Sequence, residues 1–429
     1  MKPAVGPKTF LLFVCSLAVA ALLSLPGHAR AVTVTAARAL DVATGKMLPR
    51  PLIRIEKGII VDLGTHRPGE PVDIDLGDVT LLPGLIDAHV HLTGGEEQSP
   101  DEKRRETAAR AALEAANNAR RTLESGFTTV RDLGSRDLVD VALRDAIGRG
   151  KVPGPRMLVA IKGVSATGGH GDDNALPPDI EVHRYNTVAD GPDAVRSKVR
   201  ENIKYGADWI KMMATGGVTS YGTDPRQCDY TEEELRAGVL AAREKGRDVA
   251  VHAHGSLGIL RAARAGARSV EHASMLDDDA VAAVRKNGTF LVMNPVTNLV
   301  MGERGGSGGY TSYQLQKSRE VYTMKLASLK RAVAAKLAVA YGTDSGVQAH
   351  GSNARQLGIY VEAGMSPLQA IQSATVVNAR LLRLEGKVGG LAKGHFGDLV
   401  AVKGDPLANI RLLEQPVFVM KEGVVALRR

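Results

Sequence analysis

The segment that decides the fold is Leu82-Pro83-Gly84-Leu85-Ile86-Asp87-Ala88-His89-Val90-His91. An apolar stretch next to a Pro-Gly pair is typical of a buried strand. Residues two apart on a strand point to the same face, so His89 and His91 would present two imidazoles side by side. Paired neutral imidazoles are good ligands for zinc and similar divalent metals. A lone H-x-H pair is more often one surface and one core histidine, so the interpretation depends on matching ligands elsewhere.

Strand and helix signals alternate over most of the remaining chain. We predict strands at residues 81–92, 128–133, 157–164, 209–214, 249–254, 269–273, 290–295 and 337–343. Helical patterns fall between most of them, including residues 104–124, 232–245 and 313–336. Eight successive β/α units favour an α/β fold of the (β/α)8, TIM-type barrel class. The alternative, a doubly wound open sheet, would normally carry a glycine-rich phosphate loop after an early strand. The histidine pair stands there instead.

Both ends of the chain have a different character from the middle. Residues 32–82 show short alternating strands with Gly and Pro turns, and the tail from residue 394 to 429 repeats this pattern. We therefore predict one small β-sandwich domain built from residues 32–82 and 394–429. Residues 83–393 would form the barrel.

Other metal-ligating residue types fall at the ends of later predicted strands. Lys211 stands within the apolar run Trp209-Ile210-Lys211-Met212-Met213-Ala214, where a buried lysine is costly unless it is neutralised or paired. His252 and His254 form a second same-face pair, and His272 and Asp344 end two further strands. The carboxyl ends of barrel strands meet at one mouth, so the sequence predicts a metal site there.

Three local motifs carry a family resemblance. They are Thr167-Gly168-Gly169-His170-Gly171-Asp172, Lys211-Met212-Met213-Ala214-Thr215-Gly216-Gly217 and Val251-His252-Ala253-His254-Gly255. The H-x-H pair lies on the first predicted barrel strand, the aspartate Asp344 follows the last one, and the motif Gly397-Asp398-Leu399-Val400 lies near the end of the chain. With these features the chain resembles the amidohydrolase superfamily. Within it, the chain is similar to the prolidase-like and imidazolonepropionase-like branch and to the ochratoxin-hydrolysing amidohydrolases.

The resemblance implies a binuclear centre that holds two divalent metal ions, with zinc as the expected metal. His89 and His91 would bind the more buried ion, and His252 and His272 the outer one. Lys211, carboxylated by carbon dioxide, would bridge the two ions. The six expected metal ligands are His89, His91, Lys211, His252, His272 and Asp344. Imidazole and carboxylate also suit manganese, iron and cobalt.

The resemblance also implies a reaction, namely hydrolysis of an amide or peptide bond to a C-terminal amino acid. The expected substrates are dipeptides, N-acyl amino acids or an ochratoxin-type amide. Asp344 would take a proton from the attacking water and pass it to the departing amine, acting as base and then acid. His170 would contact substrate or stabilise the tetrahedral oxyanion.

Several residues keep two interpretations. Geometry alone does not choose between His252 and His254 as the ligand on that strand, and the resemblance favours His252, with His254 lining the substrate pocket. Tyr221 is a candidate pocket residue, and Arg355 is a candidate partner for a substrate carboxylate. The glycine-rich stretch 302–310 is either a mobile surface insert or an active-site lid.

Two other functions compete with this one. A cyclic-amide hydrolase or deaminase would use the same fold, but superfamily deaminases usually work with one metal and lack the bridging lysine. A non-catalytic metal-binding protein would have no need for a positioned acid/base such as Asp344.

Composition adds expectations about location and partners. Residues 1–31 combine early lysines, a short apolar run and an A-x-A signal, so we expect a cleaved signal peptide and a secreted or periplasmic enzyme with no stable membrane span. Of two cysteines only Cys228 lies outside that segment, which excludes an intramolecular disulfide. The net charge of +8 comes without a dense Lys/Arg cluster, so nucleic-acid binding is not expected. The resemblance implies a homo-oligomer.

Overall fold

The deciding segment forms two strands instead of the single predicted one. β7 (Thr80–Pro83) and β8 (Leu85–Val90) belong to different sheets and are separated by Gly84. A Cβ atom at Gly84 would lie 2.1 Å from Oγ1 of Thr128, so only glycine fits where the chain passes from one sheet to the other.

The computed structural model describes residues 31–95, 105–177, 179–180 and 186–429. Within these, residues Ala31–Arg429 form one compact unit. The expected signal peptide lies, up to residue 30, outside the described residues.

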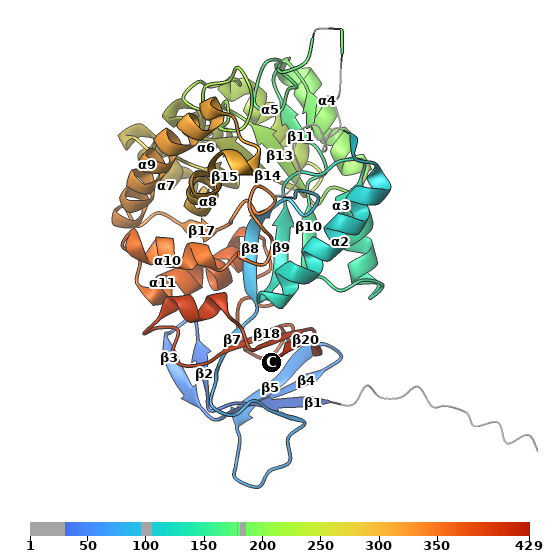
Figure 1. The fold of residues 1–429 in the computed structure, drawn as a ribbon, viewed down its shortest axis with the longest axis vertical. Coiled ribbons are helices and arrows are strands. Elements are labelled where there is room, and N and C mark those ends of the chain that lie inside the picture. Colours follow the sequence, from blue (N-terminus) through green and yellow to red (C-terminus); the bar gives the residue numbers. More distant parts are fainter. Residues whose placement is uncertain (1–30, 96–104, 178, 181–185) are drawn as a thin grey trace, which may run out of the picture. The chain divides into compact units, whose positions relative to one another are not determined.

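Both chain ends build a β module from two sheets (Figure 1). A 4-stranded sheet has the order β5-β4-β1-β6, and a 6-stranded sheet has the order β20-β19-β18-β7-β2-β3. The strands are β1 (Val32–Thr35), β2 (Arg38–Asp41), β3 (Lys46–Pro49), β4 (Pro51–Glu56), β5 (Ile59–Thr65), β6 (Ile74–Asp75), β18 (Leu399–Val402), β19 (Phe418–Lys421) and β20 (Val424–Arg428). β18 pairs antiparallel with β7, so the two ends of the chain share one sheet.

A separate apolar cluster fills this module. Ile53 from β4, Leu81 from β7, Leu399 from β18 and Phe418 from β19 are all buried in it. Because the side chains come from both sheets and from both chain ends, hydrophobic burial holds the termini to each other.

The parallel strands form the second part of the unit. A 3-stranded sheet has the order β10-β9-β8, and a 7-stranded sheet has the order β12-β11-β13-β14-β15-β16-β17. The remaining strands are β9 (Phe127–Asp132), β10 (Arg156–Val159), β11 (Gly163–Ser165), β12 (Asn186–Val188), β13 (Trp209–Met213), β14 (Asp248–Ala253), β15 (Ser269–His272), β16 (Phe290–Met293) and β17 (Val339–Tyr341). Pairs such as Met213↔His252 and Ala253↔His272 align the carboxyl ends of neighbouring strands.

Backbone hydrogen bonds join these two sheets at both margins. The Asp208 N–H donates to the Val159 carbonyl at 2.8 Å, which links the end of β10 to the start of β13. On the other margin the Asp344 N–H donates to the His89 carbonyl at 2.7 Å. The chain is thus an α/β fold with parallel-strand sheets.

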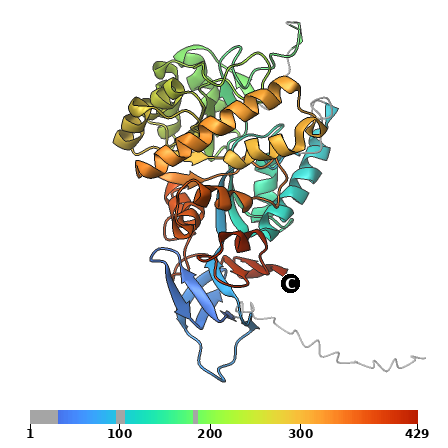
Figure 2. The same ribbon diagram turned by 60° about the vertical axis from the view of Figure 1, so that its left-hand side comes forward.

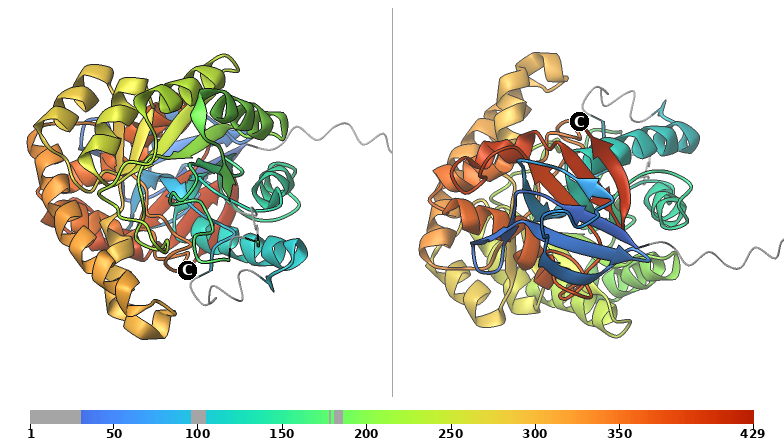
Figure 3. Two further views of the ribbon diagram at one scale, coloured as in Figure 1. Left: turned by 90° about the horizontal axis from the view of Figure 1, so that it is seen from above. Right: turned by 90° about the horizontal axis from the view of Figure 1, so that it is seen from below.

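Helices follow most of the parallel strands and lie around them (Figure 3). They are α2 (Ala108–Glu124), α3 (Val139–Gly148), α4 (Gly191–Lys204), α5 (Glu232–Arg243), α6 (Ser256–Ala265), α7 (Asp278–Asn287), α8 (Pro295–Arg304), α9 (Ser312–Ala334), α10 (Arg355–Glu362), α11 (Pro367–Gln372) and α12 (Asn378–Leu381). The remaining short helices are the 3-10 helices η1 (Gly305–Gly308) and η3 (Ile410–Glu414) and the π-helix η2 (Ser373–Val377). None of the helices in the described ranges is long and apolar enough to span a bilayer.

Two sequence predictions need correction. The predicted strand at 157–164 is divided into β10 and β11, because Ile161 adopts a positive φ of 63° that a strand does not accommodate. The glycine-rich stretch 302–310, expected to be a mobile insert or a lid, begins inside α8 and continues as the short 3-10 helix η1.

Candidate metal centre

A cavity of about 210 Å³ lies at the carboxyl ends of the parallel strands. Its lining includes every predicted metal ligand, namely His89, His91, Lys211, His252, His272 and Asp344. The aligned register of parallel strands explains this convergence, because the histidines lie at or directly after the ends of their strands, Asp344 follows β17, and Lys211 lies within β13.

The opening histidine pair lies next to Asp344. Nε2 of His91 is 3.2 Å from Oδ1 of Asp344, and Nε2 of His89 is 3.4 Å from the same oxygen. Burial, followed by the charge of Lys211, lowers the pKa of His89 to about 4, so His89 meets the carboxylate as a neutral imidazole. For His91 burial acts in the same direction, but the hydrogen bond and charge of Asp344 outweigh it and raise the pKa.

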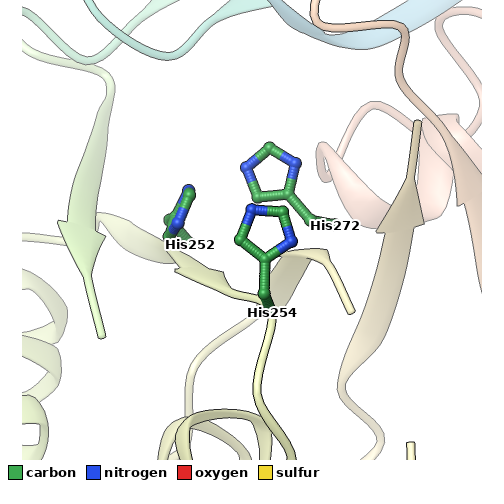
Figure 4. Close-up of side chains that lie close together, drawn as sticks. All are labelled: His252, His254 and His272. Carbon is green, nitrogen blue, oxygen red and sulfur yellow. The ribbon is translucent and has the colours of Figure 1, made fainter. Parts of the chain in front are cut away.

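A second group consists of His252 at the end of β14, His254 directly after it, and His272 at the end of β15. One ligand atom from each of the three lies within 4.8 Å of the others. Figure 4 shows the three rings gathered in one place. Burial is the main reason that the pKa of each is well below its usual value, so all three are neutral and offer a lone pair.

Hydrogen bonds at Nδ1 orient four of these rings. Nδ1 of His89 lies 2.8 Å from Glu271 Oε2, and Nδ1 of His91 lies 3.0 Å from the Gly134 carbonyl. Nδ1 of His254 lies 2.7 Å from Ser274 Oγ, and Nδ1 of His272 lies 2.9 Å from Asn294 Oδ1. When Nδ1–H donates, Nε2 keeps the lone pair, which is how proteins commonly orient histidine for a metal.

Lys211 lies in the centre of this arrangement. It comes from β13, is only 2% exposed, and its Nζ lies 3.4 Å from Nε2 of His89. Burial lowers its pKa to about 8, although Glu271 and Asp344 act in the opposite direction. The neutral amine is therefore far more accessible here than in a solvent-exposed lysine.

Two of the site residues hold an uncommon backbone conformation. His272 has a φ of 70° and Asp344 a φ of 61°, the left-handed region that favours glycine. Such strain persists where the surrounding structure fixes it and is concentrated at functional sites. The Asp344 N–H is fixed by the His89 carbonyl, so the strained residue is tied to the first histidine strand.

The structure separates the four predicted substrate-binding residues into two pairs. His170 and His254 both line the cavity, and the His170 ring stacks on His252 with ring centroids 4.3 Å apart. Tyr221 is 66% exposed and Arg355 pairs with Glu303 at 2.8 Å, and neither is among the residues that line the cavity. The roles of Tyr221 and Arg355 therefore stay predictions from the sequence, without support from the lining of this cavity.

Sequence reasoning missed the residues that support the ligands. Glu271 accepts one hydrogen bond from Nδ1 of His89 and another from Arg131 at 2.9 Å. The side chains of Glu271 and Arg131 are both fully buried. Lys325, on α9, lines the cavity, and burial lowers its pKa to about 7. Glu271 adjoins His272 in the sequence and was available as a signal, whereas Lys325 resembles any other helix lysine.

The donor set fits divalent metal ions. Buried neutral imidazoles, a lysine that can lose its charge and an aspartate supply the nitrogen and oxygen ligands that zinc and similar metals accept. A second set within the same 4.8 Å limit comprises His89, His272 and Asp344, so His272 belongs to both groups.

The chain matches known proteins over most of its length. A model of the amidohydrolase family matches residues 80–426. The chain is 30% identical over 356 residues to ochratoxinase from Aspergillus niger, covering 78% of this chain and 72% of that protein. Among solved structures, a Xaa-Pro dipeptidase with bound methionine matches with a TM-score of 0.85 and 36% identity, covering 92% of this chain and 99% of that one.

A prolidase complexed with N-methylphosphonate-L-proline also matches, with a TM-score of 0.86 and 29% identity over 93% of this chain and 100% of that one. The family match spans both the histidine pair and the strand-end aspartate that border the cavity. The chain belongs to the amidohydrolase family and is a hydrolase that acts on amide bonds.

Proposed function

We propose that this protein is a binuclear metal-dependent amidohydrolase that cleaves an amide or peptide bond to a C-terminal amino acid. Dipeptides such as Xaa-Pro, N-acyl amino acids and ochratoxin-type amides are the proposed substrates. The observation that carries the proposal is the gathering of buried neutral histidines, Lys211 and Asp344 around one cavity. Similarity to an ochratoxinase and to a Xaa-Pro dipeptidase supports the substrate class.

The proposed ligands divide between two divalent metal ions, for which we propose zinc. His89 and His91 would hold one ion, and His252 and His272 the other. Lys211 would contribute as a carbamate, formed when its neutral Nζ bonds to the carbon of carbon dioxide and releases a proton. Asp344 completes the site. A lowered pKa of Lys211 supports this step, because only the neutral amine reacts.

Bound divalent metal ions would supply the Lewis acidity that activates water and polarises the scissile carbonyl. The chain supplies the proton transfers. Asp344 Oδ1, close to Nε2 of both His89 and His91, accepts the proton of the attacking water and returns it to the leaving nitrogen. His170 and His254 line the same cavity and would contact the substrate or its developing oxyanion.

We also propose the complete architecture that this function requires. The parallel strands form a closed (β/α)8 barrel over residues 83–393, with a β-sandwich of residues 32–82 and 394–429. The hydrogen bonds that join the two parallel sheets at Val159 and His89 support closure. An N-terminal leader and a homo-oligomer stay predictions from the sequence.

The test combines metal analysis with a substrate panel. We expect two metal ions per chain and release of a free amino acid from at least one Xaa-Pro dipeptide, N-acyl amino acid or ochratoxin-type amide. Asp344→Asn should keep the metal but lower kcat by about 10²- to 10⁴-fold, because general acid/base catalysis is lost. Normal turnover by this variant, or one metal ion with release of ammonia, would contradict the proposal.

The two histidines of β14 need a separate comparison. We propose His252 as the ligand and His254 as a residue of the substrate pocket, so His252→Asn should lose one metal ion per chain. His254→Asn should retain both ions and alter KM or kcat. The reverse pattern in metal content would exchange the two roles.

A further inference from the structure

Lys325 is a buried lysine that the reaction proposed above does not use. It is 2% exposed and comes from α9, the long helix on the outside of the parallel strands (Figure 2). Its Nζ donates to Oδ1 of Asn298 at 2.7 Å and to Oδ1 and the carbonyl of Asn294 at 2.8 Å and 3.3 Å. The three acceptors match the three donors of an ammonium group, and none is a carboxylate.

Asn294 connects Lys325 to the metal centre. Its Oδ1 accepts from Lys325 Nζ and also lies 2.9 Å from Nδ1 of His272. Nζ donates to this oxygen, which places the oxygen of the amide, and not its NH2 group, towards Lys325. The same oxygen then faces His272, whose Nδ1 must carry the proton and whose Nε2 keeps the lone pair.

The amide NH2 group of Asn294 shows that this orientation carries an energetic cost. Nδ2 of Asn294 is buried and has no hydrogen-bond partner among the described residues. A buried donor without a partner is unfavourable, so the amide gains nothing on that side. The contacts of Oδ1 with Lys325 and His272 are the polar contacts that favour the observed orientation.

We propose that Lys325 is a positioning residue, which acts through Asn294 to fix the Nδ1–H tautomer and the ring orientation of His272. The inference rests on the proposed function in that His272 is taken to be a metal ligand. Partners of ligating histidines typically change metal affinity by about 10- to 100-fold when they are removed.

The sign of the change in metal affinity when Lys325 is replaced separates the positioning role from two other roles. A cation near a metal site repels the metal, so a purely electrostatic effect of Lys325 predicts that Lys325→Met raises metal affinity. A purely structural role predicts a loss of folding stability without a specific loss of metal. The positioning role predicts lower metal affinity in a protein that stays folded, because an apolar residue of similar length is often tolerated in place of a buried charge.

The experiment measures the zinc affinity of the full chain by chelator competition, together with thermal unfolding of the metal-free protein. Lys325→Met should lower the zinc affinity by about 10- to 100-fold. Lys330→Met, the same substitution at an exposed position of α9, serves as the matched control and should leave it unchanged. Lys325→Gln, which keeps an N–H donor, should give a smaller loss than Lys325→Met.

A double-mutant cycle tests the route through Asn294. Asn294→Leu should lower the zinc affinity by a similar factor, and the double variant should lose little more than either single one, because both remove the same constraint. Independent, multiplicative losses would overturn the route through Asn294. Unchanged or higher affinity in Lys325→Met would overturn the positioning role itself.

A readout on the metal-free protein distinguishes a failure of this inference from a failure of the proposed function. Nitrogen-15 NMR of histidine should show His272 as the Nδ1–H tautomer in the parent chain and a mixture of tautomers in Lys325→Met. A single Nε2–H tautomer in the parent chain would overturn the inference even if the protein hydrolyses amides. Correct tautomers with no hydrolysis of any amide would instead count against the proposed function.

Discussion

At the scale of single residues, burial of ionisable side chains accounts for most of the chemistry of this protein. Desolvation is the largest influence on Lys211, Lys325 and the histidines of the cavity, and it favours their neutral forms. The same influence acts on carboxylates away from the cavity lining. Burial, followed by the charge of Asp132, raises the pKa of Asp140 on α3 to about 7.

Asp140 gives a pH-dependent prediction. Its folded-state pKa lies above its unfolded value, so the stability linked to its proton is fully present below about pH 4 and is lost as the pH rises through about 7. Asp140→Asn has no charge to bury, but it keeps only one of the two oxygens that accept from the backbone N–H groups of Val141 and Ile161. We therefore expect the parent chain to lose more than about 1 kcal/mol of stability relative to this variant between pH 4 and pH 8, measured by urea unfolding.

At pH 4, where Asp140 is neutral, the free energy of unfolding of the variant should equal that of the parent chain or lie below it, because the variant has one acceptor fewer. Asp145→Asn is the matched control, because Asp145 lies on the same helix with its side chain 45% exposed, and its replacement should change little at either pH. A stability difference between Asp140→Asn and the parent chain that stays the same from pH 4 to pH 8 would contradict the prediction.

At the scale of elements, α9 supports the loop that follows β13. Nζ of Lys317 donates to the carbonyls of Gly217, Ser220 and Thr223 at 2.9, 2.8 and 3.1 Å. Oγ of Ser220 in turn lies 2.9 Å from Nδ1 of His170. The loop that α9 holds against the cavity is thus the one after β13. The stretch 302–310, for which a lid was one interpretation, is partly helical.

The substitution Gly217→Ala tests how closely this loop packs against His170. A Cβ atom there would lie 2.1 Å from Nδ1 of His170, so Gly217→Ala must displace either the ring or the loop. Because His170 is proposed to contact substrate, we expect kcat/KM to fall at least about 10-fold, as misplacement of a substrate-positioning group commonly does. Steady-state kinetics with the best substrate of the panel would measure this.

Gly302→Ala is the matched control for that substitution. Gly302 lies in α8, and a Cβ atom there meets nothing within 4 Å. The control should keep kcat/KM and gain up to about 1 kcal/mol of stability from its higher helix propensity. Equal kinetics in both alanine variants would show that His170 does not need the space at Gly217.

At the scale of the whole molecule, no disulfide bond contributes to the stability of the described residues. Cys228 is a free thiol, and the fold relies on separate apolar clusters in the β module and around the parallel strands. The proposed metal ligands come from β8, β13, β14, β15 and the residue segment after β17. A metal ion bound by these ligands would therefore connect elements that are far apart in the sequence.

Metal removal gives a prediction at this scale. A ligand that binds only the folded state stabilises it by about 4 kcal/mol when the free ligand concentration is about a thousand times Kd. We therefore expect removal of the metal by a chelator to lower Tm by at least about 3 °C, and addition of zinc to restore it. The double variant His252→Asn/His272→Asn should show a smaller shift. Scanning calorimetry would measure both, and an equal shift in the two proteins would place the effect outside this site.

The sequence alone determined the α/β class and the candidate ligands. Lys211 was recognisable because it interrupts an apolar strand, and His89 and His91 because strand geometry places alternate residues on one face. These signals are local, since they depend only on the residues of one strand. The family match over residues 80–426 confirmed the resemblance that the motifs carried.

Only the tertiary structure decided which side chains from separate elements meet. Lys325 is a helix lysine like the exposed Lys330, and its contact with Asn294 depends on how α9 packs. Arg355 has a charge suitable for a carboxylate, yet it pairs with Glu303 outside the cavity. Local patterns specify strands and their faces, whereas contacts between distant elements depend on packing, which no single stretch of sequence contains.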